Sequence, residues 1–247
     1  MIMIFNLNVA DYRVKAFDVV RNEQFIDVIN GRRELDKENS PPRPEKIPMM
    51  TARRLSVGCR MAVDVGTLLF EKHPDIEAVI YSSRSGEIER NFKILNAVTS
   101  GQECSPTDFS MAVHNCGVGN FTILNKATIP STSISSGKDT FMQALMEAYA
   151  MLQTDYKKVL LVDYEVTIPD FYMGYLREDI FNFPYAVGLI LAQGDDICIE
   201  QKAAKEMPGS SPYPPAVEFL KNYVKQVKSF SIEGKNRTWN IEHKSAG

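Results

Sequence analysis

The sequence predicts a layered α/β fold in which helices cover a mixed, mostly buried sheet. Segments with apolar residues at helical spacing alternate along the chain with short β-prone runs. The two central runs, 76–83 and 158–165, are apolar on both faces, which is typical of strands covered by helices on both sides. The 247 residues show no internal repeat and suffice for one core, so we expect a single domain over residues 1–247.

The first half of the chain carries the clearest alternation of helical and extended patterns. A β-rich, alternating segment predicts a strand over 1–9. Residues 31–50 include the charged, proline-rich stretch DKENSPPRPEKIP, which predicts a solvated loop. Apolar residues at helical spacing predict helices over 52–71 and 85–98, on either side of the strand at 76–83.

The middle of the chain continues this pattern. Residues 109–126 are expected to be helical in part, and STSIS, at 131–135, predicts a short strand. The segment 138–153 places its apolar residues on one helical face, and the strand at 158–165 follows it.

The last third is expected to be antiparallel and then polar. The runs 185–194 and 196–203 predict two antiparallel strands that turn at Gly194-Asp195-Asp196. An amphipathic helix is expected over 214–227, and a polar tail over 230–247.

Composition argues against several classes of protein. The net charge is −3, and Lys and Arg are scattered apart from short clusters, so no basic stripe offers a track for nucleic acid. No run reaches the roughly 18–20 apolar residues of a membrane-spanning helix, and the N-terminal segment lacks the features of a signal peptide. The four cysteines are far apart and form no CxxC motif. We therefore expect a soluble, cytoplasmic protein.

The stretch AVHNCGVG places His114 two residues before Cys116, and these are the components of a thiolate–imidazole nucleophile. Residues i and i+2 share a face on a strand, but they point about 200° apart on a helix. Because this segment is expected to be helix or irregular turn, we expect no direct contact between the two side chains. Cys116 is then interpreted as a small buried residue.

Serine chemistry is the second candidate. The sequence SISSGKDTF places Ser135 and Ser136 between a strand and a helix, but it lacks the GxSxG motif of a nucleophile elbow. The other two histidines, His73 and His243, lie at a helix end and in the expected polar tail, where neither is a persuasive base. A pairing of either serine with Lys138 remains formally open.

Metal and nucleotide motifs give no further candidate. Three histidines share no ligand spacing, and HExxH and DxD motifs are absent from the sequence, so no metal site is expected. The sequence GVGN lacks the third glycine of a dinucleotide-binding loop, and we expect no cofactor.

A longer stretch is more specific. The residues SSRSGEIERNFKILNAVTSGQECSPTDFSMAVHNCGVGNFTI (82–123), IPSTSISSGKDTFMQALMEA and KVLLVDYEVTIPDF resemble the β-ketoacyl-synthase-like N-terminal domain family. These proteins are short ketosynthase relatives encoded with aryl polyene and related fatty-acid-type pathways. The shared elements are S-R-x-G-E, S-P-T-x-F-S-x-x-V-H-N, and P-S-T followed by G-x-D-x-F, in order over about residues 50–200. The resemblance implies one half of a thiolase-like fold.

The resemblance also implies where a nucleophile should lie. Full ketosynthases carry a T-A-C-x-S turn after a G-P-S-T strand, and that cysteine attacks the acyl thioester with the help of two histidines. Counting on from Asn115 and Pro130 without gaps places this position at Lys138. The two histidines belong to the second half of a synthase, and this sequence offers no credible counterpart. We therefore expect no catalytic residue and no condensation by this chain alone.

A silent relative of this kind can replace one subunit of the ketosynthase dimer, as a chain-length factor does. The expected partner is therefore an active ketosynthase, and an acyl carrier protein is left open as a second. The silent subunit helps to wall the tunnel for the growing chain, and the residues implied for that wall are Ile88, Phe92, Phe109 and Met111. The residues implied for the dimer interface are His114, Asn115, Ser131, Thr132, Ser133, Ile134 and Ser135.

One alternative stays open from the sequence. A stand-alone acyl-thioester hydrolase or acyltransferase could use Ser135, Ser136 or Cys116 as its nucleophile.

Overall fold

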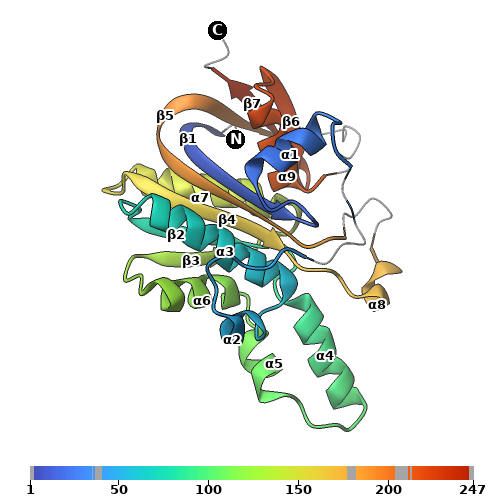
Figure 1. Cartoon of the computed structure of the whole chain (residues 1–247). Coiled ribbons are helices and arrows are strands. Elements are labelled where there is room, and N and C mark those ends of the chain that lie inside the picture. Colours follow the sequence, from blue (N-terminus) through green and yellow to red (C-terminus); the bar gives the residue numbers. More distant parts are fainter. Residues whose placement is uncertain are drawn as a thin grey trace.

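A mixed sheet runs through the protein and carries helices on both faces (Figure 1). The computed structural model describes residues 3–34, 36, 41–176, 182–203, 211 and 213–244. Within these residues, seven strands form one sheet in the order β3-β2-β4-β5-β7-β6, and β1 pairs with β5. The strands are β1 (Met3–Ala16), β2 (Ala78–Ser82), β3 (Ser131–Ile134), β4 (Lys158–Glu165), β5 (Tyr185–Ala203), β6 (Ser229–Glu233) and β7 (Arg237–His243).

The parallel part of the sheet is buried on both faces. Strand β2 pairs in parallel with β3 and with β4, and every residue of β2 is buried. Neighbouring residues point to opposite cores: Val79 and Leu160 belong to one apolar cluster, whereas Ile80 and Leu161 belong to the other. The prediction of an α/β fold with a mixed, helix-covered sheet is confirmed.

Two pairs of helices make the covering layers. Helices α3 (Val57–Lys72) and α6 (Cys116–Asn125) pack on one face, and α7 (Thr140–Leu152) and α9 (Pro215–Val224) pack on the other. Helix α3 begins after Ser56, whose hydroxyl accepts a hydrogen bond from the Cys59 backbone N–H. This N-cap satisfies one of the backbone donors that a helix start leaves free. No helix among the described residues is long and apolar enough to span a membrane.

The remaining helices are short or project from the sheet. Helices α4 (Ile88–Thr99) and α5 (Pro106–Met111) extend together from the lower end of the molecule, near α2 (Met49–Ala52) (Figure 1). Arg90 ties them to the body, because its guanidinium donates to Asp108 and to the Arg54 carbonyl. The other short elements are α1 (Asn22–Ile29), the 3₁₀ turn η1 (Gly137–Asp139) and α8 (Asp170–Met173).

The prediction of a hairpin that turns at Gly194-Asp195-Asp196 is wrong. Strand β5 continues through these residues, and it curves around the upper part of the sheet (Figure 1). Leu7 of β1 faces Ile197, but the next residue, Asn8, faces Ala192, so residues 193–196 form a bulge opposite β1. Strand β1, which extends to Ala16 rather than ending near Val9, pairs along both parts of β5 and holds them as one strand.

The expected polar tail is also wrong over residues 230–243. Strands β6 and β7 form there, and β7 pairs with the second part of β5. Trp239 and Ile241 are buried in the core, whereas the polar residues that alternate with them, Thr238, Asn240 and Glu242, are half-buried or exposed. This half-buried pattern reads as polar because only one residue in two is apolar. Residues 245–247 lie outside the described part of the chain.

The loop expected over 31–50 is anchored at its second end rather than solvated throughout. The backbone N–H groups of Glu45 and Lys46 donate to the Asp64 carboxylate, and Ile47 is buried. Asp64 also pairs with buried Lys15, so a charged cluster inside the protein fixes this segment. Residues 35 and 37–40 lie outside the described part.

Candidate functional site

A cavity of about 380 Å³ opens beyond the carboxyl ends of β2 and β4. Crevices at this edge of open α/β sheets are common ligand sites. Its walls come from the loop after β2, from η1 and α7, from α8, from the start of α9 and from β6. The lining residues that matter below are Arg84, Ser85, Ile88, Lys138, Asp163, Glu165, Tyr172, Tyr185 and Glu233.

Lys138 contributes its side chain to this cavity. Its ammonium Nζ lies 2.8 Å from Glu233 Oε1, on β6. An ammonium that donates to a carboxylate has no lone pair with which to attack an acyl carbon. The position expected for a ketosynthase nucleophile is therefore a half-buried ion pair, which sequence counting alone could not reveal.

The buried carboxyl group of Asp163, on β4, lies at the bottom of the cavity. Its carboxylate accepts hydrogen bonds from the Ser82 hydroxyl at 2.5 Å and from the Tyr185 hydroxyl at 2.8 Å. Burial raises the pKa of Asp163 to about 7. This carboxyl group therefore titrates near neutral pH, even though both hydrogen-bond donors favour its charged form.

Glu165 lies two residues further along β4. Its carboxylate accepts the backbone N–H groups of Arg84 and Ser85, which fixes the loop between β2 and α4. Burial raises the pKa of Glu165. The Glu165 carboxylate thus holds this rim of the cavity in place by binding the backbone of the loop.

The structure separates the four residues that the sequence implies for a tunnel wall. Ile88 lines the cavity. Phe92 stacks on Phe171 with ring centroids 5.3 Å apart, and it also meets Tyr172, which lines the cavity. Phe109 is 70% exposed on α5. Met111 lies against Cys116, with 3.6 Å between the two sulfurs.

His114 and Cys116 do not contact each other through a hydrogen bond. His114 Nε2 lies 2.8 Å from the Ser83 carbonyl, which can only accept, so this nitrogen carries a proton. The other nitrogen, Nδ1, lies 2.8 Å from the Ser133 hydroxyl, which also donates to the His114 backbone carbonyl at 3.1 Å. Both ring nitrogens are engaged, and the imidazole fastens the loop before α6 to β3. His114 and Cys116 therefore have different hydrogen-bond partners, because Cys116 meets Cys59 and Met111 instead.

Strand β3 contains most of the residues implied for an interface. Ser131, Thr132, Ser133 and Ile134 form β3, which pairs with β2 on one side and stands at the end of the strand order. Asn115 is exposed, and Ser135, just beyond the strand, donates to the Arg84 carbonyl at 3.3 Å. The structure brings these residues to one edge of the sheet.

The serines of the alternative enzyme lie near Lys138 without forming a nucleophile. The Ser136 backbone N–H donates to the Thr140 hydroxyl at 2.9 Å. Among the hydrogen bonds of the described residues, none joins the hydroxyl of Ser135 or Ser136 to a histidine or to Lys138.

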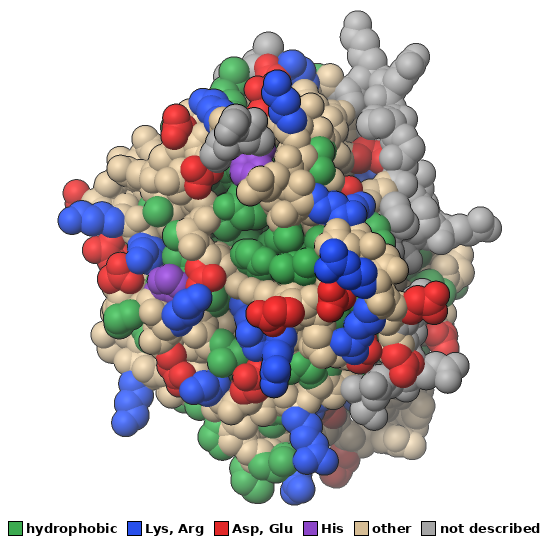
Figure 2. All heavy atoms as spheres, turned by 45° about the horizontal axis from the view of Figure 1, so that its top comes forward, with side chains coloured by type: hydrophobic (Ala, Val, Ile, Leu, Met, Phe, Trp, Pro, Cys, Tyr) green, Lys and Arg blue, Asp and Glu red, His purple; other side chains and the backbone are tan. Residues whose placement is uncertain are grey.

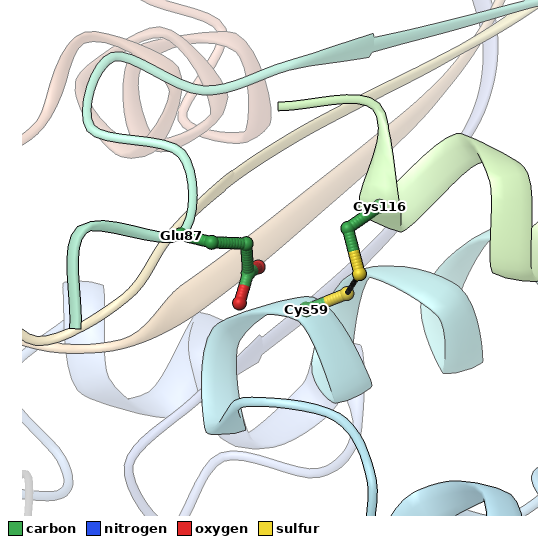
Figure 3. Close-up of side chains that lie close together, drawn as sticks. All are labelled: Cys59, Glu87 and Cys116. Atoms are coloured by element: carbon green, nitrogen blue, oxygen red, sulfur yellow. Dashed lines mark hydrogen bonds between the residues drawn. The ribbon is translucent and has the colours of Figure 1, made fainter. Parts of the chain in front are cut away.

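The fold also brings together three buried side chains that the sequence did not indicate as a group. Cys59 of α3, Glu87 before α4 and Cys116 at the start of α6 point toward one another (Figure 3). The Cys59 thiol donates to Cys116 Sγ at 3.8 Å, which raises the pKa of Cys59 and lowers that of Cys116. Burial raises the pKa of Glu87. No spacing rule could find this trio, because 57 residues separate the cysteines.

The charge pattern of the surface is mixed. On the face drawn in Figure 2, acidic and basic side chains of the described residues are interspersed. Such a surface does not concentrate a field of one sign.

Comparisons with known proteins give a consistent family. One chain of the complex between the ketosynthase ApeO and its chain length factor ApeC from Xenorhabdus doucetiae is 35% identical, with a TM-score of 0.89; the match covers 97% of this chain and 100% of that one. The ishigamide ketosynthase/chain length factor is 12% identical, with a TM-score of 0.65, over 81% of this chain and 68% of that one.

A β-ketoacyl synthase from Burkholderia phymatum is 11% identical, with a TM-score of 0.59, over 83% of this chain and 66% of that one. The last two similarities concern the fold alone. No curated protein sequence matches this chain. The family model described as "Beta-ketoacyl synthase, N-terminal domain" matches residues 29–242. This match spans most of the sequence, and the chain therefore belongs to the β-ketoacyl synthase N-terminal domain family.

Proposed function

We propose that this chain is a non-catalytic, chain-length-factor-like subunit that pairs with an active β-ketoacyl synthase. In that complex it helps to wall the tunnel for the growing acyl chain, in aryl polyene or related fatty-acid-type biosynthesis in the cytoplasm. The observation that carries the proposal is the Lys138–Glu233 ion pair at the position where family members carry a nucleophile. The ammonium of Lys138, paired with Glu233, keeps this turn folded but cannot attack an acyl thioester.

The sheet edge supports the pairing. Among the described residues β3 pairs with β2 alone, so its other row of backbone groups is available for a partner strand. The 35% identical chain comes from a complex of a ketosynthase with its chain length factor, which is consistent with the same arrangement here. An acyl carrier protein is a further partner under this proposal. The candidates to attract an acidic carrier are Arg53, Arg54 and Arg60, of which the first two are exposed and the third is half-buried.

The deciding experiment is co-expression with the ketosynthase encoded beside this chain, followed by sizing and a product assay. We expect a heterodimer whose condensing activity disappears when the cysteine of the ketosynthase is replaced by alanine. The Lys138→Ala variant of this chain should retain condensation in the complex. A chain that stays monomeric beside that ketosynthase contradicts the proposal.

The same preparation tests the hydrolase or acyltransferase alternative. We expect no thioester turnover by the isolated chain. Turnover that disappears in the Ser135→Ala, Ser136→Ala or Cys116→Ala variant would instead establish an independent enzyme.

A further inference from the structure

The side chains of Cys59, Glu87 and Cys116 come together inside the protein. Both cysteines are almost completely buried: Cys59 is 0% exposed and Cys116 is 5% exposed. One ligand atom from each of the three residues lies within 4.8 Å of the other two. Glu87 is 1% exposed, and its carboxylate is aimed at the two sulfurs (Figure 3).

We propose that Cys59, Glu87 and Cys116 form a structural binding site for one Zn²⁺ ion. The distance between the sulfurs carries the argument. Two thiolates bound to one tetrahedral Zn²⁺ at about 2.3 Å stand about 3.8 Å apart. The separation of the two Sγ atoms is 3.8 Å, so the protein already holds them at the span of a zinc ligand pair.

Two buried polar atoms at the same place lack hydrogen-bond partners. Glu87 Oε1 accepts from the Ser56 hydroxyl at 3.1 Å, but Glu87 Oε2 is buried without a hydrogen bond. The Tyr164 hydroxyl is also buried without one, and it lies 3.3 Å from where a Cβ on Gly117, next to Cys116, would stand. The Arg90 guanidinium lies 3.4 Å from Glu87 Oε2, a longer contact than a metal–oxygen bond. A metal would bind this oxygen directly, and the phenol could donate to a thiolate, as outer-shell groups do.

The chemistry of the donors selects the metal. Thiolates are soft ligands and a carboxylate is a hard one, so the mixed set suits the borderline Zn²⁺ better than Cu⁺, Mg²⁺ or Ca²⁺. Binding forms two Zn–S bonds and one Zn–O bond, and the two thiol protons leave to solvent. Water or the Met111 thioether, 3.6 Å from Cys116 Sγ, can complete the four-coordinate shell.

A cationic side chain lies beside the site and reduces its negative charge in the metal-bound state. One Zn²⁺, two thiolates and one carboxylate carry a net charge of −1, and the Arg90 guanidinium, which pairs with Asp108 as well, lies 3.4 Å from Glu87 Oε2 and reduces this charge. A disulfide is the competing outcome, but it needs the sulfurs at about 2.0 Å.

Metal analysis of the full chain tests the site, whether or not the proposed function holds. The reduced protein is incubated with Zn²⁺, passed through a desalting column and analysed by mass spectrometry for metal content. We expect about one zinc ion per chain, and almost none in the Cys59→Ala/Cys116→Ala double variant. Cys104→Ala/Cys198→Ala is the matched control, since it removes the other two cysteines and should keep the ion.

Two measurements decide the question even when the double variant does not fold. Co²⁺ bound to the wild-type chain should show thiolate-to-cobalt charge transfer and the intense visible bands of a tetrahedral site. Tyr164→Phe should keep the stoichiometry but weaken zinc binding about 10- to 100-fold in competition with a chromophoric chelator. Wild-type protein that retains no zinc, a folded double variant that retains it, or a Cys59–Cys116 disulfide in place of metal overturns the proposal.

Discussion

The ammonium of Lys138 lies 2.8 Å from the Glu233 carboxylate, across 95 residues of sequence. The pair joins the turn before α7 to β6 and closes one side of the cavity. We expect Lys138→Met to lower the free energy of unfolding by about 1 kcal/mol, because both side chains are partly exposed and solvent screens the pair. Urea denaturation of the isolated chain measures this, and Glu233→Gln with the double variant completes the cycle. Equal and additive losses would show that the pair contributes nothing.

Asp163 predicts a pH dependence of stability. Its pKa is about 7 in the folded protein, above the ordinary value of 3.8, so the folded state binds the proton more tightly than the unfolded state. The stabilisation that this group contributes is complete below pH values near its ordinary pKa. It is lost as the pH rises from there through the pKa of the folded protein. The loss amounts to a few kcal/mol, since a tenfold change in proton affinity is about 1.4 kcal/mol.

Denaturation between about pH 4 and about pH 8 tests this prediction. The Asp163→Asn variant should show a much flatter curve. Glu165→Gln should flatten the curve by a smaller amount, because burial raises the pKa of that carboxyl as well and its charge contributes to the raised pKa of Asp163. A wild-type chain that becomes more stable as the pH rises through this window contradicts the assignment.

The open edge of β3 predicts the effect of a single proline. The Pro130 and Ile134 carbonyls accept from β2, so by the alternation of a strand the backbone N–H of Ser131 points to the free edge. Ser131→Pro removes that donor without breaking a bond to β2. We expect about tenfold weaker binding to the partner ketosynthase, since one or two lost hydrogen bonds cost about 1–2 kcal/mol. Ser131→Ala retains the N–H and should bind normally; equal affinity of both variants would remove β3 from the interface.

Phe92 predicts a change in product length. Its stacking on Phe171 and Tyr172 supports a wall of the cavity. In the reconstituted pair, we expect Phe92→Ala to lengthen the products while condensation persists, because the shortened side chain leaves space behind the wall. Mass spectrometry of the products measures this. Val98→Ala, on the exposed side of the same helix, is the control, and an unchanged profile in the Phe92 variant would exclude that residue from the tunnel wall.

The two glycines of CGVG should respond oppositely to alanine. A Cβ on Gly117 would stand 2.9 Å from the Tyr81 ring, whereas a Cβ on Gly119 meets nothing within 4 Å. We expect Gly117→Ala to lower the free energy of unfolding by about 1–3 kcal/mol. Gly119→Ala should leave it unchanged or raise it by up to about 1 kcal/mol, because alanine favours the helix. Thermal denaturation of the isolated chain compares the two, and equal effects would contradict the packing of α6.

The sequence by itself determined the elements whose pattern is local. The buried strands 76–83 and 158–165, the helices around them and the family motifs around residues 82–142 follow from spacing within a short window. The absence of a cysteine at position 138 is equally a matter of sequence. These features depend on a few neighbouring residues, so a periodic pattern is enough to find them.

Only the tertiary structure decided what distant segments do together. Whether Gly194-Asp195-Asp196 turns or bulges depends on β1, nearly 190 residues away, whose length holds β5 in one piece. Likewise, β7 exists because β5 offers it an edge. The cavity around Lys138 and the trio of Cys59, Glu87 and Cys116 depend on contacts between such segments. Long-range pairing is set by the free energy of the whole packed core, and no local pattern records it.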